Sequence, residues 1–152
     1  MTYLDHSATT PLLPEALEAM RSAWAQHANP SSLHASGRRA RALLEEARET
    51  LAAEYGARPG DVVFTAGGTE ADNLAVKGLF WARRDADPRR TRIITSPIEH
   101  HAVLDTIAWL AAHEGAQVEL VDVDATGRVD PEGLRTALAR DPGSVALVSI
   151  MW

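Results

Sequence analysis

Residues 92–123 read RIITSPIEHHAVLDTIAWLAAHEGAQVELVDV, and this stretch decides the fold class. The segments at 92–96 and 117–123 are short and rich in Ile and Val, which is typical of buried strands. Residues 101–114 between them repeat apolar side chains at helical spacing, so we expect a helix that ends at Gly115. Its inward residues are expected to be Val103, Leu104, Ile107, Leu110 and Ala111. A strand, a helix and a second strand in this order predict parallel pairing through a crossover helix.

The same alternation continues on both sides of this stretch. Further strands are predicted at 61–65 (DVVFT) and 145–152 (VALVSIMW). Helices are predicted at 14–26, at 38–55, from Thr69 to about Arg84, and at 131–140 with Asp130 as the N-cap. This order predicts an α/β fold, a mostly parallel sheet with helices on both faces. We expect residues 1–60 to form a helical N-terminal segment and residues 61–152 to begin the sheet.

The overall composition sets limits on function. The 152 residues are 45% hydrophobic and 24% charged, with a net charge of −6, which suits one domain with a core. The acidic balance disfavours a broad nucleic-acid surface, and no apolar run approaches the roughly 20 residues that a membrane span needs. The N-terminus lacks the basic and apolar regions of a signal peptide, so a cytoplasmic location is expected.

Two residue counts restrict the chemistry further. The sequence holds no Cys, so these residues contain no disulfide, no thiolate metal ligand and no cysteine nucleophile. It holds one Lys, Lys77, through which any Schiff base would have to form. Lys77 follows Thr69 by eight residues on the same predicted helix, about 12 Å along its axis. A surface role with a buried aliphatic stem is therefore the better interpretation of Lys77.

The last predicted strand, 145–152, is apolar enough to lie deep in the sheet, yet the sequence stops on Trp152. In open α/β sheets, ligands bind beyond the carboxyl ends of the strands. We therefore expect these residues to be the truncated N-terminal part of a longer protein.

The loop AGGT (66–69) is a candidate phosphate site. Gly67 and Gly68 allow a tight turn before the helix, and Thr69 is expected to cap it, with Asp72 completing a capping box. Free amides at a helix start, together with the helix dipole, attract a phosphate. A glycine-rich turn with a routine threonine cap and no ligand explains the same residues, so both interpretations stay open.

His100 and His101 follow the predicted strand at 92–96 and are expected near the same edge of the sheet as the glycine-rich loop. A histidine there could stack on a flat cofactor or move protons. The alternative is a loop histidine that caps a helix or faces water. No metal site is expected, because no HExxH motif or other ligand spacing is present.

Five segments together resemble the cysteine desulfurases, class V members of the fold-type I pyridoxal-phosphate (PLP) enzymes. They are YLDHSATTP (3–11), NPSSLHASGR (29–38), VVFTAGGTEADNLAVKG (62–78), IITSPIEHHAVLD (93–105) and LVSIMW (147–152). They lie in order across the chain, whereas members of that family are far longer. The resemblance implies that residues 1–152 are the N-terminal portion of a PLP-binding domain.

The resemblance also implies roles for individual residues. Gly68 and Thr69 match the positions that hold the cofactor phosphate. His100 matches the histidine that stacks on the pyridine ring and assists proton transfer, which makes it both a cofactor-binding and a catalytic residue. Ala8–Thr10 resemble a segment that borders the substrate pocket. His101 inherits no role.

Complete relatives use PLP to remove sulfur from L-cysteine, which gives L-alanine and an enzyme persulfide for iron–sulfur cluster or thio-cofactor assembly. The resemblance therefore implies a sulfur-acceptor or scaffold protein as partner and a homodimer when complete, with no nucleic acid and no membrane. The Schiff-base lysine and the nucleophilic cysteine of the family have no match in these residues, so the 152-residue chain alone is expected to be inactive.

Two alternatives stay open at this level. One is a selenocysteine lyase or another class V PLP enzyme, since the segments that separate these activities are not among these residues. The other is a split or degenerate product that catalyses nothing.

Overall fold

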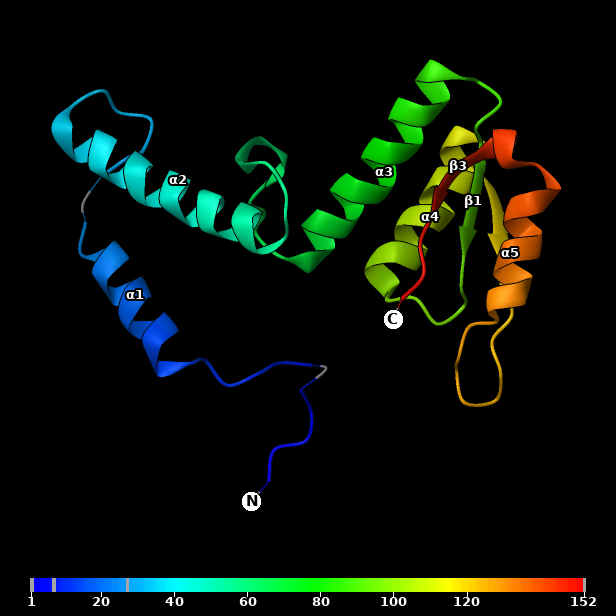
Figure 1. The fold of residues 1–152 in the computed structure, drawn as a ribbon, viewed down its shortest axis with the longest axis horizontal. Coiled ribbons are helices and arrows are strands. Elements are labelled where there is room, and N and C mark those ends of the chain that lie inside the picture. The colour runs from blue at the N-terminus through cyan, green and yellow to red at the C-terminus, as the bar shows by residue number, and fades with distance from the viewer. Residues whose placement is uncertain (1, 7, 27, 152) are drawn as a thin grey trace. The chain divides into compact units, whose positions relative to one another are not determined.

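The computed structural model describes residues 2–6, 8–26 and 28–151. The chain divides into two compact units, Met1–Val63 and Phe64–Trp152. The first unit contains α1 (Pro14–Trp24), α2 (Ala35–Glu54) and the short 3-10 helix η1 (Pro59–Asp61), all labelled or traceable by colour in Figure 1. The second contains α3 (Gly68–Ala86), β1 (Arg92–Thr95), α4 (His101–Glu114), β2 (Gln117–Leu120), α5 (Pro131–Arg140), the 3-10 helix η2 (Pro142–Ser144) and β3 (Val145–Val148). No helix among the described residues is both long and apolar enough to cross a membrane.

The helices of the first unit begin where local signals place them. Pro14 occupies the first position of α1, as predicted. Helix α2 begins at Ala35, earlier than the predicted residue 38, because the His34 side chain caps it by accepting a hydrogen bond from the Gly37 amide at 3.3 Å. Among the described residues of this unit, only Gly37 and Ala52 are buried. The two helices therefore form no hydrophobic core by themselves.

Gly37 is buried because the loop before α2 packs directly against it. A Cβ atom at this position would lie 2.2 Å from the Ser32 carbonyl oxygen and 2.8 Å from that of Asn29. Both neighbours are backbone atoms, which cannot swing away as a side-chain end can. The absence of a side chain at Gly37 is therefore what lets the NPSS loop (29–32) fold back onto α2.

We predict that Gly37→Ala lowers the free energy of unfolding by about 1–3 kcal/mol or more, because the new methyl group overpacks the loop. Gly78→Ala in α3 is the matched control, since a Cβ there meets nothing within 4 Å and helical Ala is favoured over Gly by about 0.5–1 kcal/mol. Urea unfolding of the two variants and the wild type measures both effects. A Gly37→Ala protein as stable as the wild type would contradict the close approach.

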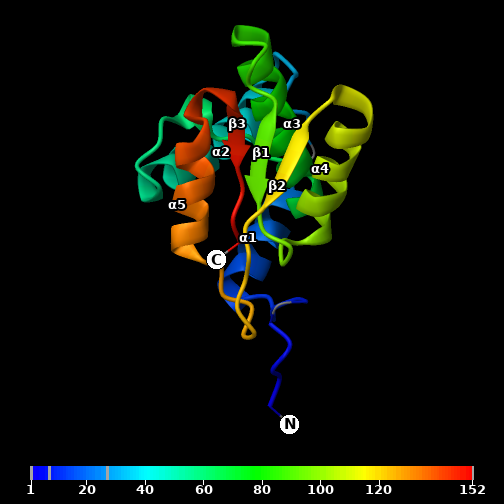
Figure 2. The same cartoon turned by 90° about the vertical axis from the view of Figure 1, so that its right-hand side faces the viewer.

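The second unit is built on a three-stranded parallel sheet in the order β2–β1–β3. Ile93 of the central strand pairs with Val118 on one side and with Leu147 on the other. Figure 2 views the three strands side by side, with α5 and α4 to either side of them. The predicted α/β class, with a parallel sheet flanked by helices, is confirmed for these residues.

Successive residues of β1 belong to two different apolar clusters. Ile93 packs in the cluster that includes Phe80 of α3 and Leu110 of α4, and Ile94 packs with Val121 and Ala137. This follows from the strand period of two residues, which sends neighbouring side chains to opposite faces. All four residues of β1 are buried, so both faces of the central strand are covered.

Several boundaries match the sequence prediction closely. Helix α4 spans residues 101–114 as predicted, and Gly115 ends it in the left-handed conformation at φ 72°. Asp130 caps α5 by accepting a hydrogen bond from the Glu132 amide at 3.0 Å. Of the inward positions predicted for α4, Leu104 is half-buried and Ala111 is exposed, whereas Ala102 and Thr106 are buried in addition.

The predicted strand at 61–65 is wrong. Val62 has an extended backbone (φ −92°, ψ 122°), but no strand of the described residues pairs with this segment, and Val63 is 64% exposed. The Val62 carbonyl instead accepts a hydrogen bond from the Arg48 guanidinium. An apolar β-branched run favours extended backbone, but a strand also needs a hydrogen-bonded neighbour, which local sequence does not specify.

The other two strands beside β1 end earlier than predicted. Strand β2 stops at Leu120 because the chain then turns back on itself, with Val123 and Val129 forming an isolated antiparallel bridge. Strand β3 stops at Val148, and Trp152, the last residue of the predicted strand, lies outside the described residues.

Candidate functional site

The start of α3 presents free backbone amides. The first hydrogen bond of the helix runs from the Ala71 amide to the Gly67 carbonyl at 3.1 Å. The amides of Gly68, Thr69 and Glu70 therefore precede the helical ladder and have no acceptor within it. A Cβ atom at Gly67 or Gly68 would meet nothing within 4 Å, so the space around this turn is open.

The predicted cap by Thr69 is wrong. Helix α3 begins at Gly68 and its N-cap is Gly67, two residues before the predicted cap; no side-chain cap hydrogen bond is present, and Thr69 lies inside the first turn. Glu70, rather than Asp72, reaches back and accepts a hydrogen bond from the Ala66 amide at 2.7 Å. The Thr69 hydroxyl is therefore not engaged in capping, while its carbonyl accepts a hydrogen bond from the Asn73 side chain at 2.9 Å.

Helices α3 and α4 run side by side with their N-termini at the same end. A groove between the two helices is lined by residues of both. Thr69 of α3 and His101 of α4 line its start, and Lys77 of α3 and Trp109 of α4 line it further along. At the far end, Arg84 of α3 and Glu114 of α4 form an ion pair at 2.8 Å. Two helix dipoles thus place their positive ends together, which makes this end of the pair favourable for an anion.

His100 is the N-cap residue of α4. Its Nδ1 accepts a hydrogen bond from the Ala102 amide at 3.1 Å, and its carbonyl accepts from the Val103 and Leu104 amides. An accepting Nδ1 carries no proton, so in the neutral ring the proton sits on Nε2. The interpretation of His100 as a helix cap is confirmed, and the residue is exposed.

The neighbouring His101 points elsewhere. It is strongly exposed and lies 4.0 Å from the Asp105 carboxylate, one helical turn away on α4. Lys77, the one lysine, places its ammonium 4.6 Å from the centre of the Trp109 ring, which agrees with the predicted surface role. Among the described residues, no group of His, Asp and Glu side chains is arranged to hold a metal ion.

Glu99 is a residue to which sequence reasoning gave no role. It is buried in the loop between β1 and α4, directly before His100. Its carboxylate accepts hydrogen bonds from the Ser96 hydroxyl at 3.4 Å, from the Ser149 hydroxyl at 3.1 Å and from the Met151 amide. Two of these donors lie about fifty residues further along the chain, so no local pattern reveals the contact.

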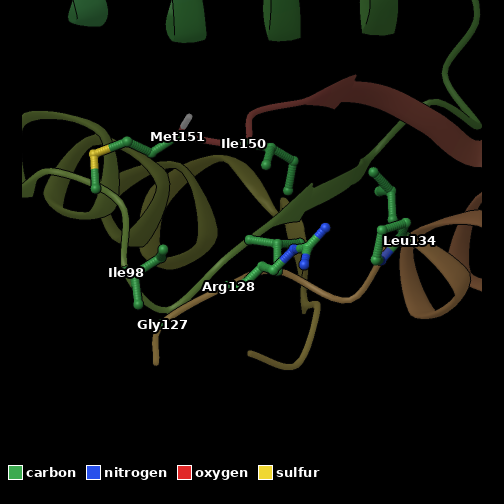
Figure 3. A pocket seen from close by; sticks show the side chains of 8 residues that line it. Ile98, Gly127, Arg128, Leu134, Ile150 and Met151 are labelled. Atoms are coloured by element: carbon green, nitrogen blue, oxygen red, sulfur yellow. The ribbon is translucent and has the colours of Figure 1, made fainter. Parts of the chain in front are cut away.

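An apolar cavity of about 640 Å³ opens beyond the carboxyl ends of β1 and β3 (Figure 3). Its lining residues are Ile98, Gly127, Arg128, Val129, Pro131, Leu134, Ile150 and Met151. Arg128 is the one charged residue among them. Gly68, Thr69 and His100 do not line this cavity. It shares no lining residue with the groove between α3 and α4, so the two are separate.

The segment of the first unit that resembles a pocket border folds into a short turn. The Tyr3 hydroxyl, which has one proton to donate, lies 2.8 Å from the Asp5 carbonyl oxygen and 3.0 Å from that of Thr9. The amides of Ala8 and Thr9 both donate to the Asp5 carbonyl within this turn, and Ser7 of the same motif lies outside the described residues.

A turn beside the apolar cavity is organised by Asp124. Its carboxylate accepts hydrogen bonds from the Thr126 hydroxyl, from the Thr126 amide at 2.8 Å and from the Arg128 amide at 3.0 Å. These hydrogen bonds lower the pKa of Asp124 below its ordinary value. The bond from the Thr126 hydroxyl has the largest effect, and the two amides follow. These bonds stabilise the charged form of the side chain.

We predict that the stability lost in Asp124→Ala depends on pH. Because the folded pKa of Asp124 is lowered, its contribution is fully present above the unfolded pKa of about 3.9 and is lost as the pH falls through the folded value. The difference in free energy of unfolding between wild type and variant should therefore be constant near neutral pH and shrink in acid. A free-energy difference between wild type and variant that grows as the pH falls would contradict a lowered pKa of Asp124 in the folded protein.

Comparison with known proteins identifies the family. The family model described as "Aminotransferase class-V" matches residues 2–151. The chain belongs to the class-V aminotransferases. Among curated relatives, it is 58% identical over 152 residues to an IscS-like cysteine desulfurase of Mycobacterium tuberculosis (strain ATCC 25618 / H37Rv), an alignment that covers 100% of this chain and 38% of that protein.

Solved structures of class-V relatives agree with the fold. A NifS-like protein superposes with a TM-score of 0.85 at 36% identity, covering 97% of this chain and 39% of that one. A structure titled "SspA in complex with cysteine" gives a TM-score of 0.83 at 34% identity, covering 99% and 42%. The chain thus spans about two fifths of the length of these relatives.

Proposed function

We propose that the protein containing these residues is a PLP-dependent cysteine desulfurase, which removes sulfur from L-cysteine and passes it to an acceptor protein. The observation that carries this proposal is the pair of parallel helix starts, with free amides at Gly68–Glu70 and the exposed His100 ring at the same end. The 58% identity to an IscS-like cysteine desulfurase supports the choice of reaction. Within the complete protein, residues 1–60 and 61–152 are proposed to be a helical N-terminal segment and the first part of the PLP-binding domain.

The described residues fit a phosphate-bearing cofactor. The amides of Gly68 and Thr69 would donate to the phosphate, and the dipoles of α3 and α4 would stabilise its charge. The open space around Gly67 and Gly68 lets the group approach the backbone closely. Glu70 does not occupy these two amides, because its carboxylate accepts from the Ala66 amide instead.

The exposed ring of His100 is proposed to stack on the cofactor and to move a proton at Nε2. The cap hydrogen bond from the Ala102 amide fixes the ring tautomer, so that Nε2 holds the proton of the neutral ring. Bound PLP supplies the electron sink that such a reaction requires. The Schiff-base lysine and the nucleophilic cysteine are proposed to lie outside these residues, which contain no Cys and whose one Lys packs over Trp109.

The full-length protein tests this proposal with L-cysteine as substrate. Equal amounts of L-alanine and transferred sulfur, lost when PLP is removed and regained when it is added back, would support it. Release of selenide from L-selenocysteine without reaction of L-cysteine would favour a selenocysteine lyase instead. Purified protein that binds PLP and reacts with neither substrate would overturn the proposal, whereas residues 1–152 alone are expected to release no sulfur.

We predict that His100→Asn changes the absorbance spectrum of the bound cofactor and slows turnover. Asn is a good N-cap, so this variant keeps the start of α4 while removing the ring. His113→Asn is the matched control, because His113 is exposed and lies at the other end of α4, where its ring stacks on Trp109. Spectra and turnover of His100→Asn that equal those of His113→Asn would remove His100 from the site.

We predict that Thr69→Ala weakens PLP retention roughly 10- to 100-fold, because its hydroxyl, free of capping, donates a hydrogen bond to a charged group. Thr136→Ala is the matched control, because it removes a threonine hydroxyl at an exposed position of α5, far in sequence from the starts of α3 and α4. Equilibrium dialysis of PLP against each variant gives the dissociation constants. Equal constants for Thr69→Ala and Thr136→Ala would exclude a phosphate contact by the Thr69 hydroxyl.

A further inference from the structure

The loop that carries His100 is held by contacts on both of its sides. On the C-terminal side, α4 fixes His100 through the bond from the Ala102 amide to Nδ1 and through the first amides of the helix. On the N-terminal side lie Ser96 and Glu99, both buried. Pro97 between them restricts the backbone of Ser96 to extended conformations.

Glu99 connects this loop to a distant part of the chain. Its Oε2 accepts from the Ser149 hydroxyl at 3.1 Å and its Oε1 accepts from the Met151 amide, while Ser96 donates from within the loop at 3.4 Å. Ser149 is itself anchored to the sheet, because its amide donates to the Ile94 carbonyl at 3.0 Å. The carboxylate thus spans the ends of two neighbouring parallel strands.

A buried carboxylate needs hydrogen-bond donors in place of the water it has lost. Glu99 is 8% exposed, and a buried charge is tolerated only where hydrogen bonds replace the lost water. Both of its oxygens accept bonds, and no ion pair with Glu99 is present among the described residues. Removing the side chain would leave the Ser149 hydroxyl and the Met151 amide without their acceptor.

We infer that Glu99 is a positioning residue, which fixes the His100 loop relative to residues 149–151 after β3. The inference rests on the proposed function only in assigning the His100 ring to the cofactor, since the contacts themselves belong to the fold. Glu99 acts through neighbouring backbone and touches no reacting atom. Its effect is to make the orientation of His100 depend on the segment after β3.

Hydrogen exchange of the full-length protein, followed by mass spectrometry, tests the connection without any activity measurement. In Glu99→Ala, amides in both 149–151 and 100–102 should exchange roughly 10- to 100-fold faster than in the wild type. Glu99→Gln keeps the side-chain length and an acceptor for the Met151 amide, so it should restore protection in both segments. Glu99→Asp keeps the charge but is one methylene shorter, so it should not.

Ser149→Ala supplies a second variant in case Glu99→Ala fails to fold, because it removes one donor and leaves the carboxylate bonded to Met151 and Ser96. Ser144→Ala is its control, since the Ser144 hydroxyl bonds only to the nearby Asp141 carbonyl at 2.9 Å. Faster exchange at 100–102 in Ser149→Ala but not in Ser144→Ala supports the inference. Faster exchange confined to 149–151 overturns it.

The cofactor spectrum separates this inference from the proposed function. If the wild type binds PLP, Glu99→Ala should shift its absorbance in the direction that His100→Asn does, and Glu99→Gln should return it. A Glu99→Ala spectrum identical to that of the wild type would overturn the positioning of His100 at the cofactor. If the wild type binds no PLP, the proposed function fails, and the exchange data alone decide whether Glu99 couples the two segments.

Discussion

The central strand β1 must be buried on both faces, and the organisation of the second unit depends on this constraint. Ile93 and Ile94 send their side chains to opposite faces, so each face needs its own cover. Helices α3 and α4 supply residues to the Ile93 cluster, and α5 supplies Ala137 to the Ile94 cluster. Because both strand neighbours of β1 run parallel to it, all three carboxyl ends lie at one edge of the sheet.

The candidate functional residues of the second unit lie at this edge of the sheet. The loop after β1 contains the buried Glu99 and the exposed His100, and the segment after β3 provides the Ser149 and Met151 donors. The packing of α3 against α4 on the same face brings the free amides of α3 to the start of α4. The side chains that cover the sheet therefore also set the position of the candidate phosphate site, where the positive ends of two helix dipoles lie together.

Sequence reasoning succeeded where the signal is local and failed where it is not. The bounds of α4, the left-handed Gly115 and the Asp130 cap each follow from a few neighbouring residues, and all are present in the structure. The prediction of a 61–65 strand failed because pairing partners are not encoded locally, and the prediction of a Thr69 cap failed because the N-cap is Gly67, two residues earlier. The buried contacts of Glu99 could not be predicted, because two of its hydrogen-bond donors are about fifty residues away in the sequence and an acidic residue in a loop normally faces solvent.

A crystal structure of the full-length protein with PLP tests the central claim most directly. We expect the cofactor phosphate within hydrogen-bonding distance of the Gly68 and Thr69 amides, and the cofactor ring against the His100 imidazole, with Nδ1 still accepting from the Ala102 amide. A phosphate bound away from the start of α3, for example in the apolar cavity beside Arg128, would contradict the account.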